Sequence, residues 1–207
     1  MSNSPSIKSL FLDFGGVLLT NGWDRNLRAK AAEHFSIDLA TMNDRHRVIF
    51  DAYEAGKMTL NEYLHLLLFF EPQSFSAEEF KQFMLAGSVE FPDMVQLIKD
   101  VKQANGLSTV AVNNEGRELN QYRIAKFGMR EYIDVFASSS FVGARKPDKN
   151  IYLIGLDLAQ VKPQEVVYLD DRDVFIQVAK QLGINTIHHT DIESTKKQLQ
   201  DYGLKLN

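Results

Sequence analysis

The feature that most constrains the fold is a regular alternation between short apolar segments and segments with helical periodicity. Each apolar segment stops at a small or polar residue, and the five cover residues 7–13, 107–112, 134–137, 166–169 and 184–187. Short apolar runs of this kind are typical of strands that are covered on both faces. Strands that alternate with helices form parallel sheets built of βαβ units. The sequence therefore predicts an α/β fold, a Rossmann-like parallel sheet with helices on both faces.

The helical segments are bounded by residues that usually begin and end helices. Pro92 stands where a helix can start, and the pattern that follows it ends at Asn105 and Gly106. The remaining helical segments of this half of the chain cover residues 117–127, 149–158, 173–182 and 192–202.

One part of the chain breaks the alternation. Between about residue 21 and residue 87 we find only helical patterns, at residues 25–35, 46–56, 60–70 and 77–87. Ser76 and Glu79 have the spacing of a capping box for the last of them. Ligands of open α/β sheets bind at the carboxyl ends of strands. We therefore expect residues 21–87 to form a helical cap subdomain over such a site, and residues 1–20 and 88–207 to form the α/β core domain.

Polar side chains stand where the strands end. These residues are Asp13, Asn113, Asn114, Lys146, Asp170 and Asp171. Adjacent parallel strands would bring them into one crevice, where buried carboxylates repel one another unless a cation shares the site. A hard divalent ion such as Mg²⁺ takes oxygen ligands and keeps positions for water and a phosphate oxygen. One carboxylate can then act as a covalent nucleophile, and Lys146 can neutralise a bound anion.

Four segments together carry a resemblance to a known superfamily. They are "FLDFGGVLL" at residues 11–19, "VAVNNEGREL" at 110–119, "GARKPDKNIY" at 143–152 and "VVYLDDRDVFIQVAKQLGI" at 166–184. In this order, with a helical insertion after the first strand, they resemble the motifs of the haloacid dehalogenase-like hydrolase superfamily. Within it the chain is most similar to the sugar-phosphate phosphatases and the epoxide-hydrolase N-terminal-like domains.

The resemblance implies roles for the residues of the first motif. Asp13 matches the aspartate nucleophile, which becomes an aspartyl phosphate and also binds Mg²⁺. Gly15 stands where many members carry a second aspartate that protonates the leaving group. Gly15 can supply the main-chain carbonyl that ligates Mg²⁺, but it cannot supply the acid. General acid–base help is typically worth about 10²–10⁴-fold, so the missing acid predicts a slower enzyme rather than a dead one.

The later motifs complete the implied site. Asn113 occupies the place of a serine or threonine that holds phosphate, and Asn114 matches the asparagine often found next to it. Lys146 matches the motif lysine, a catalytic and phosphate-binding residue. Asp170 and Asp171 match the acidic pair that holds Mg²⁺ directly or through water.

These roles favour a Mg²⁺-dependent phosphatase that acts on a small phosphomonoester, with a sugar phosphate as a candidate. Two alternatives stay open. The chain can be a catalytically weakened or non-catalytic binder of a phosphorylated ligand, which Gly15 and Asn113 would explain. It can also be a 2-haloacid dehalogenase, because halide leaves without a proton, although that chemistry needs no metal and the chain keeps its acidic pair.

Composition excludes several other classes. The chain has no cysteine, which rules out disulfides, thiolate zinc sites and a cysteine nucleophile. The net charge is −4 with no block of like charge, so we expect no nucleic-acid partner. The longest apolar runs are too short to span a bilayer, and residues 1–6 lack the apolar core of a secretion signal. We expect a cytoplasmic protein, monomeric or homodimeric, without a membrane partner.

Overall fold

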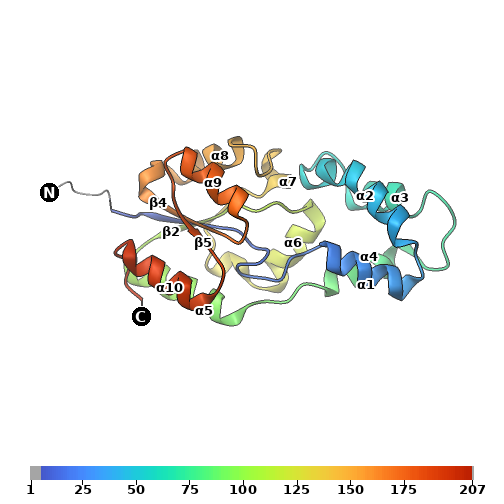
Figure 1. Cartoon of the computed structure of the whole chain (residues 1–207), viewed down its shortest axis with the longest axis horizontal. Coiled ribbons are helices and arrows are strands. Elements are labelled where there is room, and N and C mark those ends of the chain that lie inside the picture. Colours follow the sequence, from blue (N-terminus) through green and yellow to red (C-terminus); the bar gives the residue numbers. More distant parts are fainter. Residues whose placement is uncertain (1–5, 207) are drawn as a thin grey trace.

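The computed structural model describes residues 6–206, and its centre is one five-stranded parallel sheet (Figure 1). The strands are β1 Ser9–Leu12, β2 Ser108–Ala111, β3 Val135–Phe136, β4 Val166–Asp170 and β5 Asn185–His188. Their order is β3-β2-β1-β4-β5, so β1 is central and pairs in parallel with β2 and β4. This order brings the carboxyl ends of β1, β2 and β4 side by side. The predicted α/β fold class is confirmed.

Helices cover both faces of the sheet (Figure 1). They are α5 Pro92–Asn105, α6 Arg117–Lys126, α7 Ser139–Val142, α8 Asn150–Ala159, α9 Asp173–Gln181 and α10 Ile192–Asp201, with 3-10 turns η1 Met129–Glu131 and η2 Pro163–Glu165. Successive strand residues point to opposite faces. Leu10 and Leu12 of β1 accordingly pack in a core with α5 and α10, whereas Phe11 packs in a second core with α8 and α9.

The other four helices lie between β1 and β2 in the chain and form the end of the molecule away from the termini (Figure 1). They are α1 Arg25–Phe35, α2 Leu39–Glu54, α3 Leu60–Leu67 and α4 Ala77–Ala86, and we call them the cap. The cap has its own apolar core, which includes Tyr63, Leu64 and Phe80. Leu119 of α6 joins this cluster and so ties the cap to the sheet domain. The boundaries at residues 21 and 87 stay a prediction.

The cap helices follow the sequence prediction except at the start of α2. The capping box of Ser76 and Glu79 is present at the start of α4. The apolar pattern predicted a helix from residue 46, whereas α2 begins at Leu39 after the N-cap Asp38. Of residues 39–45 only Met42 is buried, so the first turns of α2 show little apolar periodicity in the sequence.

No helix in the described part of the chain is long and apolar enough to cross a membrane. Residues 1–5 of the polar N-terminal segment lie outside the described residues.

Candidate active site

The predicted site residues converge at the carboxyl edge of the sheet. Asp13 follows β1, Asn113 and Asn114 follow β2, and Asp170 and Asp171 lie at and directly after the end of β4. One oxygen from each of the three carboxylates lies within 4.8 Å of the others. The strand order, with β1 between β2 and β4, is what places them together.

Lys146 reaches into this acidic cluster and is fully buried there. Its Nζ lies 3.0 Å from Asp13 Oδ1 and 2.6 Å from Asp170 Oδ2. Burial alone would lower the pKa of the Lys146 ammonium, but attraction by the two carboxylates outweighs burial and raises that pKa above its usual value. Lys146 is therefore a fixed positive charge between the two aspartates.

Asp13 presents one free oxygen. Its Oδ1 accepts a hydrogen bond from the main-chain N–H of Phe14 at 2.8 Å and pairs with Lys146. No described residue donates to Oδ2, and Asp13 lines a cavity of about 320 Å³. Burial raises the pKa of the Asp13 carboxyl to about 7, although Lys146 acts against this, and the charge of Asp170 adds to the rise.

The two aspartates at the end of β4 differ in their partners. Asp170 Oδ2 accepts from Lys146 and from the Tyr168 hydroxyl, and Oδ1 accepts from the main-chain N–H of Arg172 at 2.8 Å. Asp171 Oδ1, by contrast, is buried and has no hydrogen-bond partner within the described residues. Burial, helped by the charge of Asp170, raises the pKa of Asp171. A buried carboxylate oxygen without a donor fits a cation ligand, so the site suits Mg²⁺, which prefers oxygen ligands.

The two asparagines hold other parts of the site in place. The Asn114 side chain accepts from Lys146 N and donates to Lys146 O, both at 2.8 Å, and so fixes the backbone of the lysine. Asn113 is almost fully buried, where it donates to Asn120 Oδ1 at 3.1 Å and accepts from the Ser138 hydroxyl at 2.7 Å. One amide hydrogen of Asn113 therefore stays available toward the cavity that it lines.

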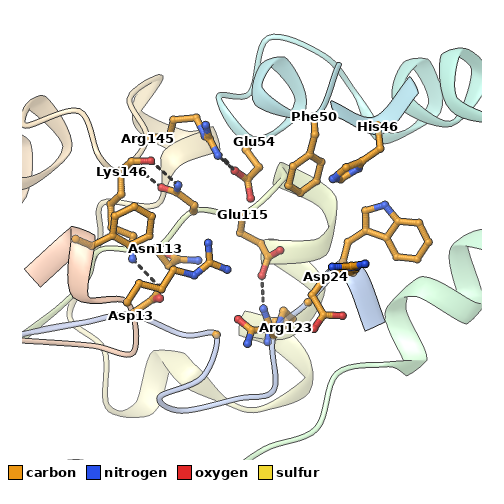
Figure 2. Close-up of a pocket in the computed structure, with 18 of the residues that line it drawn as sticks. Asp13, Asp24, His46, Phe50, Glu54, Asn113, Glu115, Arg123, Arg145 and Lys146 are labelled. Carbon is orange, nitrogen blue, oxygen red and sulfur yellow. Dashed lines mark hydrogen bonds and ion pairs between the residues drawn. The ribbon is translucent and has the colours of Figure 1, made fainter. Parts of the chain in front are cut away.

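The cavity continues from Asp13 into the cap, and its lining between these two ends contains residues that we did not predict (Figure 2). Glu115 and Arg123 form a buried ion pair there, and Arg123 also donates to the carbonyl of Thr20. Burial raises the pKa of the Glu115 carboxyl while Arg123 opposes the rise. Glu115 directly follows the asparagine pair, which was the available sequence signal, whereas nothing local marked Arg123.

A second ion pair joins the cap to the loop that carries the lysine. Glu54 of α2 accepts on Oε2 from Arg145 Nε at 3.0 Å and from Nη2 at 2.6 Å. Arg145 Nη1 lies 2.8 Å from Asp51 Oδ1, and the Ser139 hydroxyl donates to the carbonyl of Glu54 at 2.7 Å. Burial raises the pKa of the Glu54 carboxyl to about 6, with Arg145 acting against it. Because Arg145 precedes Lys146, the cap directly contacts the loop that carries Lys146.

A family model describes the chain over most of its length. The model for haloacid dehalogenase-like hydrolases matches residues 7–183. The chain belongs to the haloacid dehalogenase-like hydrolases. It is thus a member of an enzyme family whose acidic centre accepts Mg²⁺, and the predicted superfamily is confirmed.

The sequence is also similar to those of characterised proteins. Bifunctional epoxide hydrolase 2 of Rattus norvegicus is 30% identical over 135 residues, which are 62% of this chain and 24% of that protein. The chain thus spans about a quarter of the length of this relative. Phosphorylated carbohydrates phosphatase of Thermotoga maritima is 29% identical over 99 residues, 48% of this chain and 45% of that protein.

Among solved structures, the HAD family enzyme bt-2542 of Bacteroides thetaiotaomicron, in complex with magnesium and inorganic phosphate, has the same fold. The TM-score is 0.75 at 20% identity, with 89% of this chain and 95% of that chain covered.

Proposed function

We propose that this chain is a Mg²⁺-dependent phosphatase of small phosphomonoesters that works through an aspartyl phosphate, with sugar phosphates among its candidate substrates. The observation that carries the proposal is the buried arrangement in which Lys146 pairs with Asp13 and Asp170 while Asp13 Oδ2 and Asp171 Oδ1 stay free. The relative named as a phosphorylated carbohydrates phosphatase and the structure of the same fold in complex with magnesium and inorganic phosphate support it.

Asp13 is the nucleophile in this proposal. Asp13 Oδ2 attacks phosphorus, the bond from phosphorus to the alcohol oxygen breaks, and the alcohol leaves with a proton from solvent. Water then attacks phosphorus, breaks its bond to Asp13 and releases inorganic phosphate. The ammonium of Lys146 faces the phosphoryl oxygens, where fixed positive charge stabilises the transition state. Asn114 keeps Lys146 in place through the two main-chain hydrogen bonds.

The hydrogen-bond partners of the carboxylates indicate which of them would bind Mg²⁺ directly. We infer that Asp13, Asp171 and the carbonyl of Gly15 are the direct protein ligands, because Asp171 has a free buried oxygen. Asp170 has donors on both oxygens, so its task is to hold Lys146. Bound Mg²⁺ supplies positive charge that neutralises the phosphoryl group.

The proposal is tested with p-nitrophenyl phosphate, an activated ester whose leaving group needs no proton. We expect slow hydrolysis in Mg²⁺, loss of activity in EDTA and recovery when Mg²⁺ is added back. Asp13→Asn keeps the size of the side chain and removes the nucleophile, so its rate should equal that of buffer. Turnover that survives both EDTA and Asp13→Asn contradicts the proposal. Halide release from 2-chloropropionate in EDTA would favour the dehalogenase alternative instead.

The missing acid at Gly15 gives a prediction about leaving groups. A Cβ atom at this position would lie 2.7 Å from Asn21 Oδ1, so an aspartate needs room that Asn21 occupies. The double variant Gly15→Asp/Asn21→Ala is expected to raise turnover of alkyl phosphates about tenfold or more, since a general acid is worth about 10²–10⁴-fold. Turnover of p-nitrophenyl phosphate should change little. Asn21→Ala alone is the control, and an equal rise on both esters would show that the aspartate does not act as an acid.

A further inference from the structure

The cap end of the cavity is a pocket of mixed character, lined by Trp23, Asp24, Arg28, His46 and Phe50. We call these five residues the cap pocket. Figure 2 shows His46 and Phe50 on one side of the cavity and Asp24 on the other, with Asp13 at the opposite end. The alcohol part of a phosphomonoester held at Asp13 would extend toward this pocket.

A chain of hydrogen bonds fixes the orientation and the tautomer of His46. Trp23 Nε1 donates to the Tyr63 hydroxyl at 2.7 Å, and the same hydroxyl lies 2.7 Å from His46 Nδ1. The indole can only donate, so the tyrosine oxygen accepts from it. No other acceptor for the tyrosine hydrogen is found within residues 6–206, and Tyr63 is fully buried. The hydrogen of Tyr63 therefore goes to His46 Nδ1, and the hydrogen of the imidazole is on Nε2.

The imidazole remains neutral in this place. Burial, together with the charge of Arg28, lowers the pKa of His46 to about 3. The charged and titratable groups around it are Arg28 and Asp24 of the cap pocket and Tyr63 of α3. His46 is thus a neutral N–H donor whose second nitrogen is already occupied.

Two opposite charges, those of Asp24 and Arg28, stand beside His46 in the cap pocket. Asp24 uses Oδ1 to accept from the main-chain N–H of Leu27 at 2.8 Å, which leaves Oδ2 for a ligand. Arg28 donates from Nε to Asn43 Oδ1 at 2.8 Å and from Nη1 to the carbonyl of Trp23 at 3.0 Å. The exposed Arg25 lines the outer part of the cavity. The inner part therefore offers one neutral donor and one carboxylate acceptor, the pair that a hydroxyl-bearing group can satisfy.

We propose that His46, held by Tyr63 and Trp23, is a specificity-determining residue whose Nε2–H donates to an oxygen of an uncharged, hydroxylated leaving group, while Asp24 accepts a hydrogen bond from a neighbouring hydroxyl. The inference rests on the proposed phosphatase function and deepens it. It separates polyhydroxy alcohol phosphates from phosphates whose alcohol is apolar. Phe50 and Trp23 supply the apolar surface beside the polar groups.

The test compares glucose 6-phosphate with cyclohexylmethyl phosphate, which has a ring of similar size without hydroxyls. His46→Leu removes the donor, and His46→Gln keeps an N–H group near the place of Nε2. His46→Leu is expected to lower kcat/KM for glucose 6-phosphate about tenfold, the effect of one lost hydrogen bond, and for cyclohexylmethyl phosphate less than twofold. His46→Gln should recover part of the loss. Tyr63→Phe leaves His46 in place but removes the hydrogen bond that fixes its tautomer. It should therefore lower kcat/KM for glucose 6-phosphate by less than His46→Leu does, and leave kcat/KM for cyclohexylmethyl phosphate unchanged.

Binding gives a second readout that does not need turnover. Glucose 6-phosphate and cyclohexylmethyl phosphate are titrated into Asp13→Asn and into Asp13→Asn/His46→Leu. The second protein should bind glucose 6-phosphate about tenfold more weakly and cyclohexylmethyl phosphate less than twofold more weakly. The inference is overturned if His46→Leu lowers kcat/KM, or the binding affinity, equally for both phosphates. It is also overturned if the wild type does not have a higher kcat/KM for glucose 6-phosphate than for cyclohexylmethyl phosphate. Failure of the proposed function is recognised separately, because then p-nitrophenyl phosphate is not hydrolysed by the wild type in Mg²⁺ while the binding comparison still decides the role of His46.

Discussion

Lys146→Met is expected to lower turnover of p-nitrophenyl phosphate about a hundredfold to a thousandfold, the usual effect of removing a group that stabilises transition-state charge. The same variant should lose about 3–5 kcal/mol of unfolding free energy at neutral pH, because it leaves buried carboxylates without their counter-charge. The ammonium pairs with Asp13 and Asp170, and the side chains of both Lys146 and Asp170 are 0% exposed. Methionine has a similar length, so the loss reports on charge rather than on a cavity.

The loss of stability should depend on pH in a defined direction. Burial already raises the pKa of Asp13 to about 7 in the presence of Lys146, and removal of the ammonium raises it further. The pKa of an aspartate in an unfolded chain is about 3.9. Asp13 of the folded variant therefore binds a proton more tightly than Asp13 of the unfolded variant. The stability of Lys146→Met therefore rises as the pH falls from about 8 to about 5. Urea unfolding at several pH values measures this.

Lys102→Met is the matched control. Lys102 Nζ lies 2.6 Å from Asp134 Oδ1, the same distance as in the Lys146–Asp170 pair, but the two side chains are 23% and 45% exposed. Solvent screens such a pair, so we expect a loss of about 1 kcal/mol or less. The activity with Mg²⁺ should stay unchanged. The prediction is contradicted if the two methionine variants lose equal unfolding free energy, or if Lys146→Met is as stable as the wild type at pH 8. Burial of the Lys146 ion pair would then not determine its contribution to stability.

The sheet edge of the site was predictable because its residues directly follow strands. Asp13, Asp170 and Asp171 stand at the ends of apolar segments, and parallel pairing brings such ends together. Lys146 was predicted from its match to the third motif, whereas its direct contact with two carboxylates is seen only in the folded loop. The different hydrogen-bond partners of Asp170 and Asp171, on which the proposed division of their roles rests, were not predictable. They depend on the Tyr168 hydroxyl and on the turn after β4, which the sequence pattern does not specify.

The cap side of the site was not predictable for a different reason. Glu54 and His46 lie on α2, and a polar residue within a helical pattern carries no sign of its distant partner. The pairing of Glu54 with Arg145 joins residues 91 positions apart in the chain. The bonds of Asn113 to Asn120 and Ser138 were likewise not predictable, and its expected contact with phosphate stays a prediction. Contacts between cap and core need the folded structure.

Gly16→Ala is expected to weaken activation by Mg²⁺ about 10–100-fold, the range found when a group that orients a metal ligand is lost. Gly16 has a positive φ of 75°, and a Cβ atom built on it would collide with the Asp171 carboxylate. That carboxylate has the free buried oxygen that we assign to the metal. The methyl group would push Asp171 out of the cluster while Asp13 and Lys146 stay in place. The Mg²⁺ dependence of p-nitrophenyl phosphate hydrolysis measures the effect.

Gly106→Ala separates the displacement of Asp171 from the cost of the backbone conformation. Gly106 also has a positive φ, 64°, but nothing lies within 4 Å of a Cβ atom there. It precedes β2 and so lies at the end of the sheet away from the site. Both variants should lose about 1–2 kcal/mol of stability, because an L-residue is forced into the left-handed region. Only Gly16→Ala should need more Mg²⁺. An unchanged Mg²⁺ requirement in Gly16→Ala, with the same loss of stability as Gly106→Ala, would mean that Asp171 does not bind the metal and that Asp170 must release Lys146 to do so.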